Sequence, residues 1–185
     1  MELTAEIARE LLTYNPDTGK LFWKERPAKY FKNPKYVKNW NSRHAGKEGF
    51  IVHKKRDSGI FYKRGSIFSK HYYAHRIAWL IYYGEWPKKS IDHINHDRAD
   101  NRIKNLRDVT HIENLKNCSL YSTNTTGYVG VHFNKSLKKY SASAVVNSIK
   151  KHLGYYDTAE EAATAREIAN INYNFHPNHG NSKGI

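Results

Sequence analysis

Residues 90–117 read SIDHINHDRADNRIKNLRDVTHIENLKN, and this stretch decides the fold of the centre of the chain. Residues 91–94, Ile-Asp-His-Ile, predict a short strand. A polar loop follows, and residues 106–109 predict a second strand. Thr110 and Glu113 have the spacing of a capping box, so a helix should begin directly after Thr110. The predicted order is therefore strand, loop, strand, helix.

Three side chains of this stretch suit metal-assisted chemistry. Asp92 and Asn114 offer two oxygen ligands, and a hairpin packed on the helix would bring the first helical turn beside the strand. Two such oxygens, completed by waters and a phosphate, suit Mg²⁺ (or Mn²⁺). His93 would be close enough to take a proton from a water that attacks phosphorus, and a pKa near neutrality suits a general base. As neighbours on a strand, Asp92 and His93 should point to opposite faces.

The same residues resemble the motif of the HNH endonucleases, whose fold is called ββα-metal. Asp92-His93, Asn105 and Asn114 match it, and the final Asn in place of His is similar to the phage-type and homing-type members. Residues 74–87 also look like those enzymes. The resemblance implies a DNA endonuclease in which His93 is the general base and Asp92 and Asn114 bind one divalent metal ion. It also implies that Asn105 holds His93 in place and that the products carry 5′-phosphate and 3′-hydroxyl ends.

Other titratable residues near the motif have weaker claims to a role. We expect His96, Asp97 and His111 to be loop, cap or DNA-facing residues rather than metal ligands. His75 and Arg76 fit either packing or contact with a phosphate.

The charge of the chain is high and uneven. The 185 residues carry a formal net charge of +14, of which residues 20–70 supply +12. That segment interleaves basic residues with aromatic ones, a pattern that suits a groove along a phosphate backbone. The aromatic residues could equally form a small core beneath solvated lysines, and a basic surface without a partner is the simplest alternative. Nucleic acid is the favoured partner for such a charge.

Local patterns predict the elements that precede the motif. Thr4 should cap a helix with Ile7, Leu11 and Leu12 on one face, and residues 15–19 should form a turn before a strand at 21–23. Residues 25–48 lack periodicity and predict a loop with short strands. Further short strands are expected at 49–52, at 59–62 and around 67–68, and a helix is expected over 74–83 with Gly84 at its end.

The C-terminal block predicts three strands, at residues 128–133, 140–146 and 152–155, and a closing helix. Thr158 and Glu161 form a second capping box. Ala162, Ala165, Ile168 and Ala169 should line one face of the helix. From Asn174 onward the chain is polar and should be frayed.

This block resembles the Apetala-type DNA-binding domain of plant ethylene-response factors. The matching pieces lie at 127–131, 139–142, 153–154 and 157–163. The resemblance implies a sheet in the major groove, with the helix behind it. The implied groove-facing residues are His132, Asn134, Ser143, Val145, Lys150 and His152. The arginines and tryptophans of the family are absent at these positions, so bidentate contacts from Arg to guanine cannot be made there. The alternative is an α+β module for protein contact.

The complete prediction is an α+β chain. It has a small β-rich, DNA-contacting N-terminal region at 1–70 and a ββα-metal nuclease core at 71–120. An Apetala-like domain of a three-stranded antiparallel sheet plus helix follows at 121–175, and a flexible tail at 176–185. The predicted function is a metal-dependent HNH endonuclease of the phage homing type acting on double-stranded DNA. The alternatives are a non-catalytic DNA-binding protein with a degenerate nuclease fold, and an RNA-binding or RNA-cleaving protein.

Cysteine content and hydropathy indicate where the protein is located. Cys118 is the single cysteine, which excludes a disulfide framework and a four-cysteine zinc site. No apolar run approaches the roughly 18 residues that a membrane span requires. The acidic N-terminus lacks the pattern of a secretory signal. We therefore expect a soluble protein in the cytoplasm of a bacterial host, with no membrane or protein partner, and a monomer is the simplest state.

Overall fold

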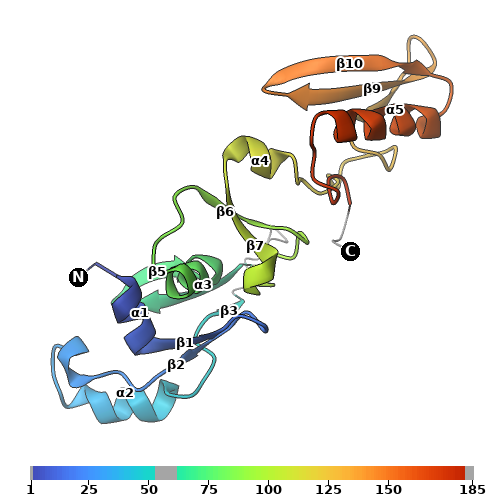
Figure 1. Cartoon of the computed structure of the whole chain (residues 1–185). Helices are drawn as coiled ribbons and strands as arrows, with labels where there is room; N and C mark the ends of the chain where they lie inside the picture. The colour runs from blue at the N-terminus through green and yellow to red at the C-terminus, as the bar shows by residue number, and fades with distance from the viewer. Residues whose placement is uncertain (1, 53–61, 182–185) are drawn as a thin grey trace. The chain divides into compact units, whose positions relative to one another are not determined.

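The computed structural model describes residues 2–52 and 62–181, and the chain divides into two compact units (Figure 1). The first unit comprises Met1–His93 and Asp97–Asp108, and the second comprises Ile94–His96 and Val109–Ile185. The stretch 90–117 is thus divided between the two units. Both units combine helices with small sheets, which confirms the predicted α+β class.

The N-terminal helix is α1 (Ala5–Leu11), and Thr4 caps it by accepting a hydrogen bond from the Ile7 amide, as predicted. The prediction that Leu12 lies on the same helical face is wrong. Leu12 has extended backbone and begins β1 (Leu12–Asn15). From this strand its side chain packs into the same buried core as Leu11.

The predicted turn at residues 15–19 joins β1 to β2 (Lys20–Trp23), and the two strands pair antiparallel. The Asn15 side-chain oxygen accepts hydrogen bonds from the amides of Asp17 and Thr18, which is the usual way Asn closes such a turn. Gly19 completes it with φ +69°.

Residues 25–48 are more helical than predicted. They contain a 3-10 turn, η1 (Ala28–Tyr30), and a helix, α2 (Tyr36–His44). The Asn41 side chain of α2 exchanges hydrogen bonds with the backbone of Arg26, and Trp40 packs against the core. Tertiary contacts of this kind stabilise a short helix whose own sequence is a weak helix signal.

A three-stranded antiparallel sheet follows, in the order β3 (Ile51–Val52), β4 (Lys63–Ile67), β5 (Lys70–Tyr73). Most of the strand predicted at 59–62 lies outside the described residues. The predicted helix at 74–83 is α3 (Ala74–Tyr83), and Gly84 ends it in the left-handed conformation.

One hydrophobic core joins these elements. Buried residues of α1 and α3 pack together with residues of β1, β2 and β4. The largest fully buried side chains of this core are Phe50, Leu11, Leu12, Leu21, Ile67, Ile77 and Leu80. Residues before and after position 70 therefore share a single core within the first unit.

The elements of the stretch 90–117 follow the predicted order. β6 (Ser90–His93) pairs with β7 (Leu106–Val109), and η2 (Ile103–Asn105) precedes β7. In the second unit, Thr110 and Glu113 form the predicted capping box of α4 (His111–Leu115).

The second unit contains the predicted three-stranded antiparallel sheet, with β9 (Lys139–Val146) between β8 (Val131–Asn134) and β10 (Ile149–Tyr156). Thr158 and Glu161 cap α5 (Ala159–Asn172) as predicted. The apolar face of α5 differs from the expectation, since Ile168 is 56% exposed whereas Arg166 is 5% exposed. Arg166 is held by Asn170, by His179 and by the ring of Phe175.

The segment after α5 is ordered as far as it is described, which differs from the frayed tail predicted. The His176 amide donates to the Lys116 carbonyl, and the Gly180 amide donates to the Cys118 carbonyl. The Asn178 side chain donates to the Ile94 carbonyl. Polar residues here satisfy backbone groups of the same unit.

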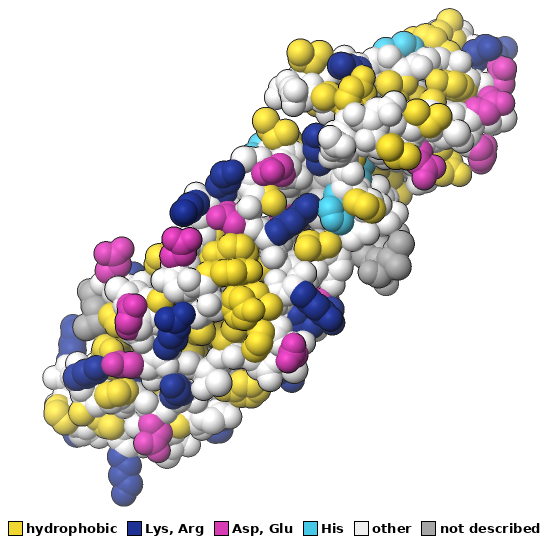
Figure 2. Space-filling view, in the orientation of Figure 1, with side chains coloured by type: hydrophobic (Ala, Val, Ile, Leu, Met, Phe, Trp, Pro, Cys, Tyr) yellow, Lys and Arg dark blue, Asp and Glu magenta, His cyan; other side chains and the backbone are white. Residues whose placement is uncertain are grey.

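The surface of the second unit carries both apolar and charged side chains. Hydrophobic side chains lie between the charged ones on the face in view (Figure 2). No helix among residues 2–52 and 62–181 is long and apolar enough to cross a membrane.

Candidate functional site

Asp92 and His93 end β6 and are both buried, with 8% and 4% of their surface exposed. Successive side chains of a strand point to opposite faces, so the two residues have different neighbours. Asp92 contacts Arg107 on the paired strand β7. His93 lies beside the Asn101 side chain and the rings of Tyr62 and His75.

The ring of His93 is held by a loop residue that the sequence did not single out. Its Nε2 atom lies 3.2 Å from Oδ1 of Asn101, a side chain that is 1% exposed. Because an amide oxygen only accepts hydrogen bonds, a neutral His93 in this pair carries its proton on Nε2 and keeps the lone pair on Nδ1. Burial lowers the pKa of His93, and the Asn101 hydrogen bond opposes that shift. The ring is therefore neutral at pH 7, the form in which it can accept a proton.

The loop that carries Asn101 is fixed from two sides. The Tyr14 hydroxyl of β1 donates to the Asn101 carbonyl at 2.7 Å, and the Ile103 amide donates to the Pro16 carbonyl at 3.1 Å. From the other side, the Asn105 side chain donates to the Asp100 carbonyl at 2.8 Å. The N-terminal hairpin thus helps to position His93 through Asn101.

Asp92 is paired with a cation. Its Oδ2 atom accepts hydrogen bonds from Nε and Nη2 of Arg107 at 2.9 and 2.7 Å. Arg107 was not predicted from the sequence, although an opposite charge on the paired strand is the signal that could have indicated it. Charge-assisted pairs of this kind fix the orientation of a carboxylate.

Asn114 lies on α4 and is partly buried. It belongs to the second unit, while Asp92 belongs to the first, so the sharing of one ion by these two residues stays a prediction. Within residues 2–52 and 62–181, no group of three or more His, Cys, Asp or Glu side chains is arranged to hold a metal ion. The predicted pair of one carboxylate and one amide is a different kind of donor set, whose hard oxygens suit Mg²⁺.

His75 is a packing residue rather than an exposed contact. Its ring stacks on Tyr73 at 5.4 Å and meets the edge of His93 at 5.1 Å. It is 8% exposed, and its Nδ1 atom has no hydrogen-bond partner among the described residues. Burial, followed by the neighbouring charges of His93 and Arg76, lowers the pKa of His75 from 6.5 to about 3.

The low pKa of His75 predicts a loss of stability in acid. Below pH 6.5 the unfolded chain binds a proton at this residue and the folded chain does not, so the stability falls until the pH reaches about 3. Between pH 7 and 4.5, the native protein should lose about 2 to 3 kcal/mol more than a His75→Phe variant. Urea unfolding at both values measures this difference. An equal loss in the two proteins would contradict the prediction.

His96 and Asp97 have local structural roles. His96 has φ +62° and its ring nitrogens lie 3.1 and 3.2 Å from Asn117 Oδ1 and the Asn181 carbonyl. Asp97 accepts a hydrogen bond from the Ala99 amide. His111 is exposed at the start of α4.

The six predicted groove-facing residues lie on one face of the second unit's sheet. α5 packs on the face that carries Val131 and Ala142, and strand alternation places the six on the opposite face. They are His132, Asn134, Ser143, Val145, Lys150 and His152.

Three of these six residues have contacts or surroundings within the unit itself. The Asn134 side chain accepts hydrogen bonds from the Ser136 and Leu137 amides, so it stabilises a turn. Ser143 and Val145 also line a cavity of 310 Å³ with residues of α4. Lys150 and His152 are exposed on β10.

Residues 72–116 match the family model described as HNH endonuclease, so the chain contains an HNH endonuclease domain in this range. The match includes α3, β6, β7 and α4, and with them Asp92, His93, Asn105 and Asn114. No curated protein and no solved structure matches the chain. The domain at residues 72–116 is thus of the nuclease class.

Proposed function

We propose that this protein is a metal-dependent HNH endonuclease of the phage homing type that hydrolyses double-stranded DNA. The observation that carries the proposal is the buried His93, held by Asn101 inside the range that matches the HNH family. A neutral imidazole with a fixed orientation is what a general base requires.

In the proposed reaction, His93 takes a proton from a water molecule. The oxygen of that water attacks the phosphorus, the bond from phosphorus to the 3′ oxygen breaks, and the leaving 3′ oxygen takes up a proton from solvent. The products carry 5′-phosphate and 3′-hydroxyl ends. Asn101 keeps the lone pair of His93 in one direction, and Asn105 and Tyr14 keep the Asn101 loop in place.

Asp92 and Asn114 are the proposed metal ligands. Their oxygens fit Mg²⁺ or Mn²⁺, which prefer hard oxygen donors. Such an ion, when bound, would stabilise the negative charge that develops on the phosphate and on the leaving oxygen. Arg107 orients the Asp92 carboxylate.

The DNA contacts of the proposal lie outside the HNH domain. The basic segment 20–70 would follow the phosphate backbone, and the open face of the second unit's sheet would lie in a groove, as in the Apetala-type domains that it resembles. Contacts to phosphate give a steep dependence of affinity on salt. The sheet face has no arginine at the implied positions, which favours modest base discrimination there.

Substitution of the two metal ligands tests the proposal. Asp92→Ala and Asn114→Ala should each reduce cleavage in Mg²⁺ by at least about 100-fold while DNA binding in EDTA is kept, because the ion's stabilisation of the transition state is lost. The control is Glu85→Gln, which removes an exposed carboxylate and should cut at the native rate. Full activity in either alanine variant would contradict the ligand assignment.

A further inference from the structure

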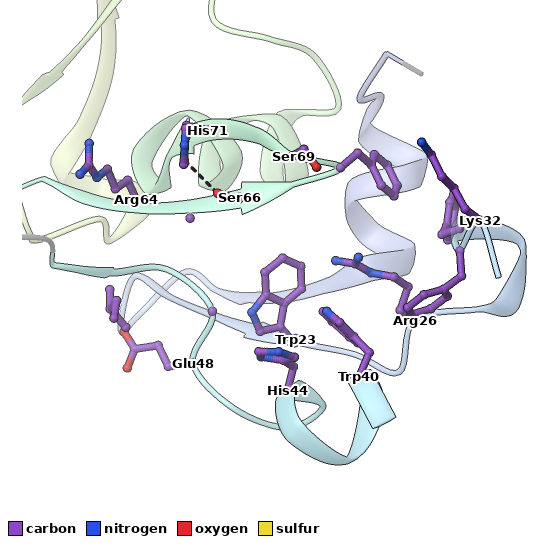
Figure 3. Close-up of a pocket in the computed structure, with 16 residues that line it drawn as sticks. Trp23, Arg26, Lys32, Trp40, His44, Glu48, Arg64, Ser66, Ser69 and His71 are labelled. Atoms are coloured by element: carbon purple, nitrogen blue, oxygen red, sulfur yellow. Dashed lines mark hydrogen bonds between the residues drawn. The ribbon is translucent and has the colours of Figure 1, made fainter. Parts of the chain in front are cut away.

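The first unit contains a pocket of 740 Å³ outside the HNH match. Residues of β2 and α2 line one side, and the β4–β5 hairpin lines the other (Figure 3). Its volume is in the range of pockets that hold small organic groups. Every lining residue belongs to the first unit, which also contains His93.

Flat aromatic rings form one wall of the pocket. The rings of Trp23 and Trp40 meet edge to face at 5.4 Å, and the His44 ring lies 4.8 Å from Trp40. The Arg26 guanidinium lies 3.9 Å from the centre of the Trp40 ring (Figure 3). Rings and guanidinium planes are the groups on which unpaired bases stack.

The residues of this wall are tightly packed. A Cβ atom on Gly49 would lie 2.7 Å from Cε2 of Trp23, so this glycine is needed for the indole to sit against the strand. Trp23 is 8% exposed and Phe50 behind it is 1% exposed. The rings are therefore held by the core and do not have to be ordered when a ligand binds.

The charge of the pocket is positive. Arg26, Lys32 and Arg64 line it, and Glu48 in the same wall already pairs with Lys20 and Lys63. The Nε–H of Arg26 is buried without a hydrogen-bond partner among the described residues. The pocket thus offers an unused donor and two exposed cations beside stacking surfaces, which suits a base with its phosphate.

We propose that this pocket holds one unpaired nucleotide of a DNA strand. Its base stacks against Trp40, and the phosphates on its two sides lie near Lys32 and Arg64, which line opposite ends of the pocket (Figure 3). Bases inside a duplex are stacked on each other, so an aromatic pocket can accept only a base that has left the helix. This inference rests on the proposed function, which makes DNA the ligand of the same unit.

Fluorescence anisotropy of the full-length protein in EDTA tests the inference. The probes are a labelled 20-base-pair duplex, the same duplex with one bulged adenine, and the same duplex with an abasic bulge. The adenine bulge should bind roughly 5- to 100-fold more tightly than the other two, because one stacked base is gained. An equal preference for the abasic bulge would overturn the inference, since the protein would then recognise the bend.

Matched variants locate the effect. Trp40→Ala should abolish the preference and Trp40→Phe should keep part of it. Tyr36→Ala, on the exposed face of the same helix, should leave the preference unchanged. Lys32→Gln and Arg64→Gln remove exposed cations and should weaken bulge binding more than Lys70→Gln, so the test does not depend on the folding of the Trp40 variants.

The two proposals fail differently. A protein that cuts DNA with metal but binds the three duplexes equally would overturn only the pocket. A protein that neither binds nor cuts DNA would overturn the proposed function and the pocket together.

Discussion

His93→Ala should reduce the rate of DNA cleavage by about 10² to 10⁴, the usual contribution of a general base. The effect should fall on the chemical step, because the imidazole is 4% exposed and contributes little surface to DNA binding. Single-turnover cleavage of a labelled duplex containing the cognate site measures the rate, and anisotropy in EDTA measures the binding.

Two further variants serve as comparisons for His93→Ala. Asn101→Ala should cause a smaller loss, because His93 remains but loses the partner that fixes its ring at 3.2 Å. His111→Ala removes an exposed imidazole of α4 and should cut like the native protein. The assignment of His93 as base would be wrong if its alanine variant cut at the native rate.

Gly19→Ala should lower the free energy of unfolding by about 2 to 4 kcal/mol. Gly19 has φ +69°, which costs an alanine about 1 kcal/mol or more, and its Cβ would lie 2.5 Å from the Asn101 carbonyl carbon and the Arg102 amide nitrogen. The β1–β2 turn and the Asn101 loop would have to separate. Cleavage should therefore also slow, since that loop positions His93.

Gly46→Ala is the matched control for this substitution. Gly46 has φ +76°, but a Cβ there would meet nothing within 4 Å. Gly46→Ala should lower the free energy of unfolding by only about 1 kcal/mol, the cost of left-handed backbone for an alanine, and should leave cleavage unchanged. Urea unfolding of the three proteins gives both values. Equal losses for the two alanine variants would show that the contact of Gly19 with the Asn101 loop is unimportant.

The sequence predicted the elements whose signals are local. The Thr4 cap, the capping boxes at Thr110 and Thr158 and the left-handed Gly84 each act within a few residues, and each sets a helix boundary that the structure confirms. The three C-terminal strands were also predicted from the sequence, and one face of their sheet is buried against α5.

What the sequence did not reveal depends on distant contacts. α2 has few helix signals and is held by Arg26 and by the core. Arg166 is buried where an apolar residue was expected, because Asn170, His179 and Phe175 surround its guanidinium. Such pairings require knowledge of which segments meet in space.

The candidate site divides in the same way. Asp92, His93 and Asn114 were predicted from the residues themselves and Asn105 from the resemblance to the HNH motif, whereas Asn101 and Arg107 emerged only from the structure. Asn101 acts on His93 because Tyr14, 87 positions away in sequence, fixes its backbone. No pattern local to residues 90–117 contains that link.

Incubation of the native protein with supercoiled DNA carrying its cognate site is the most direct test of the central claim, that this chain is a metal-dependent endonuclease. With Mg²⁺ or Mn²⁺ the plasmid should become nicked or linear, and excess EDTA should prevent this. The products should be closed again by DNA ligase, as 5′-phosphate and 3′-hydroxyl ends require. The claim would be contradicted if no DNA were cut with either ion, or if cutting continued unchanged in EDTA.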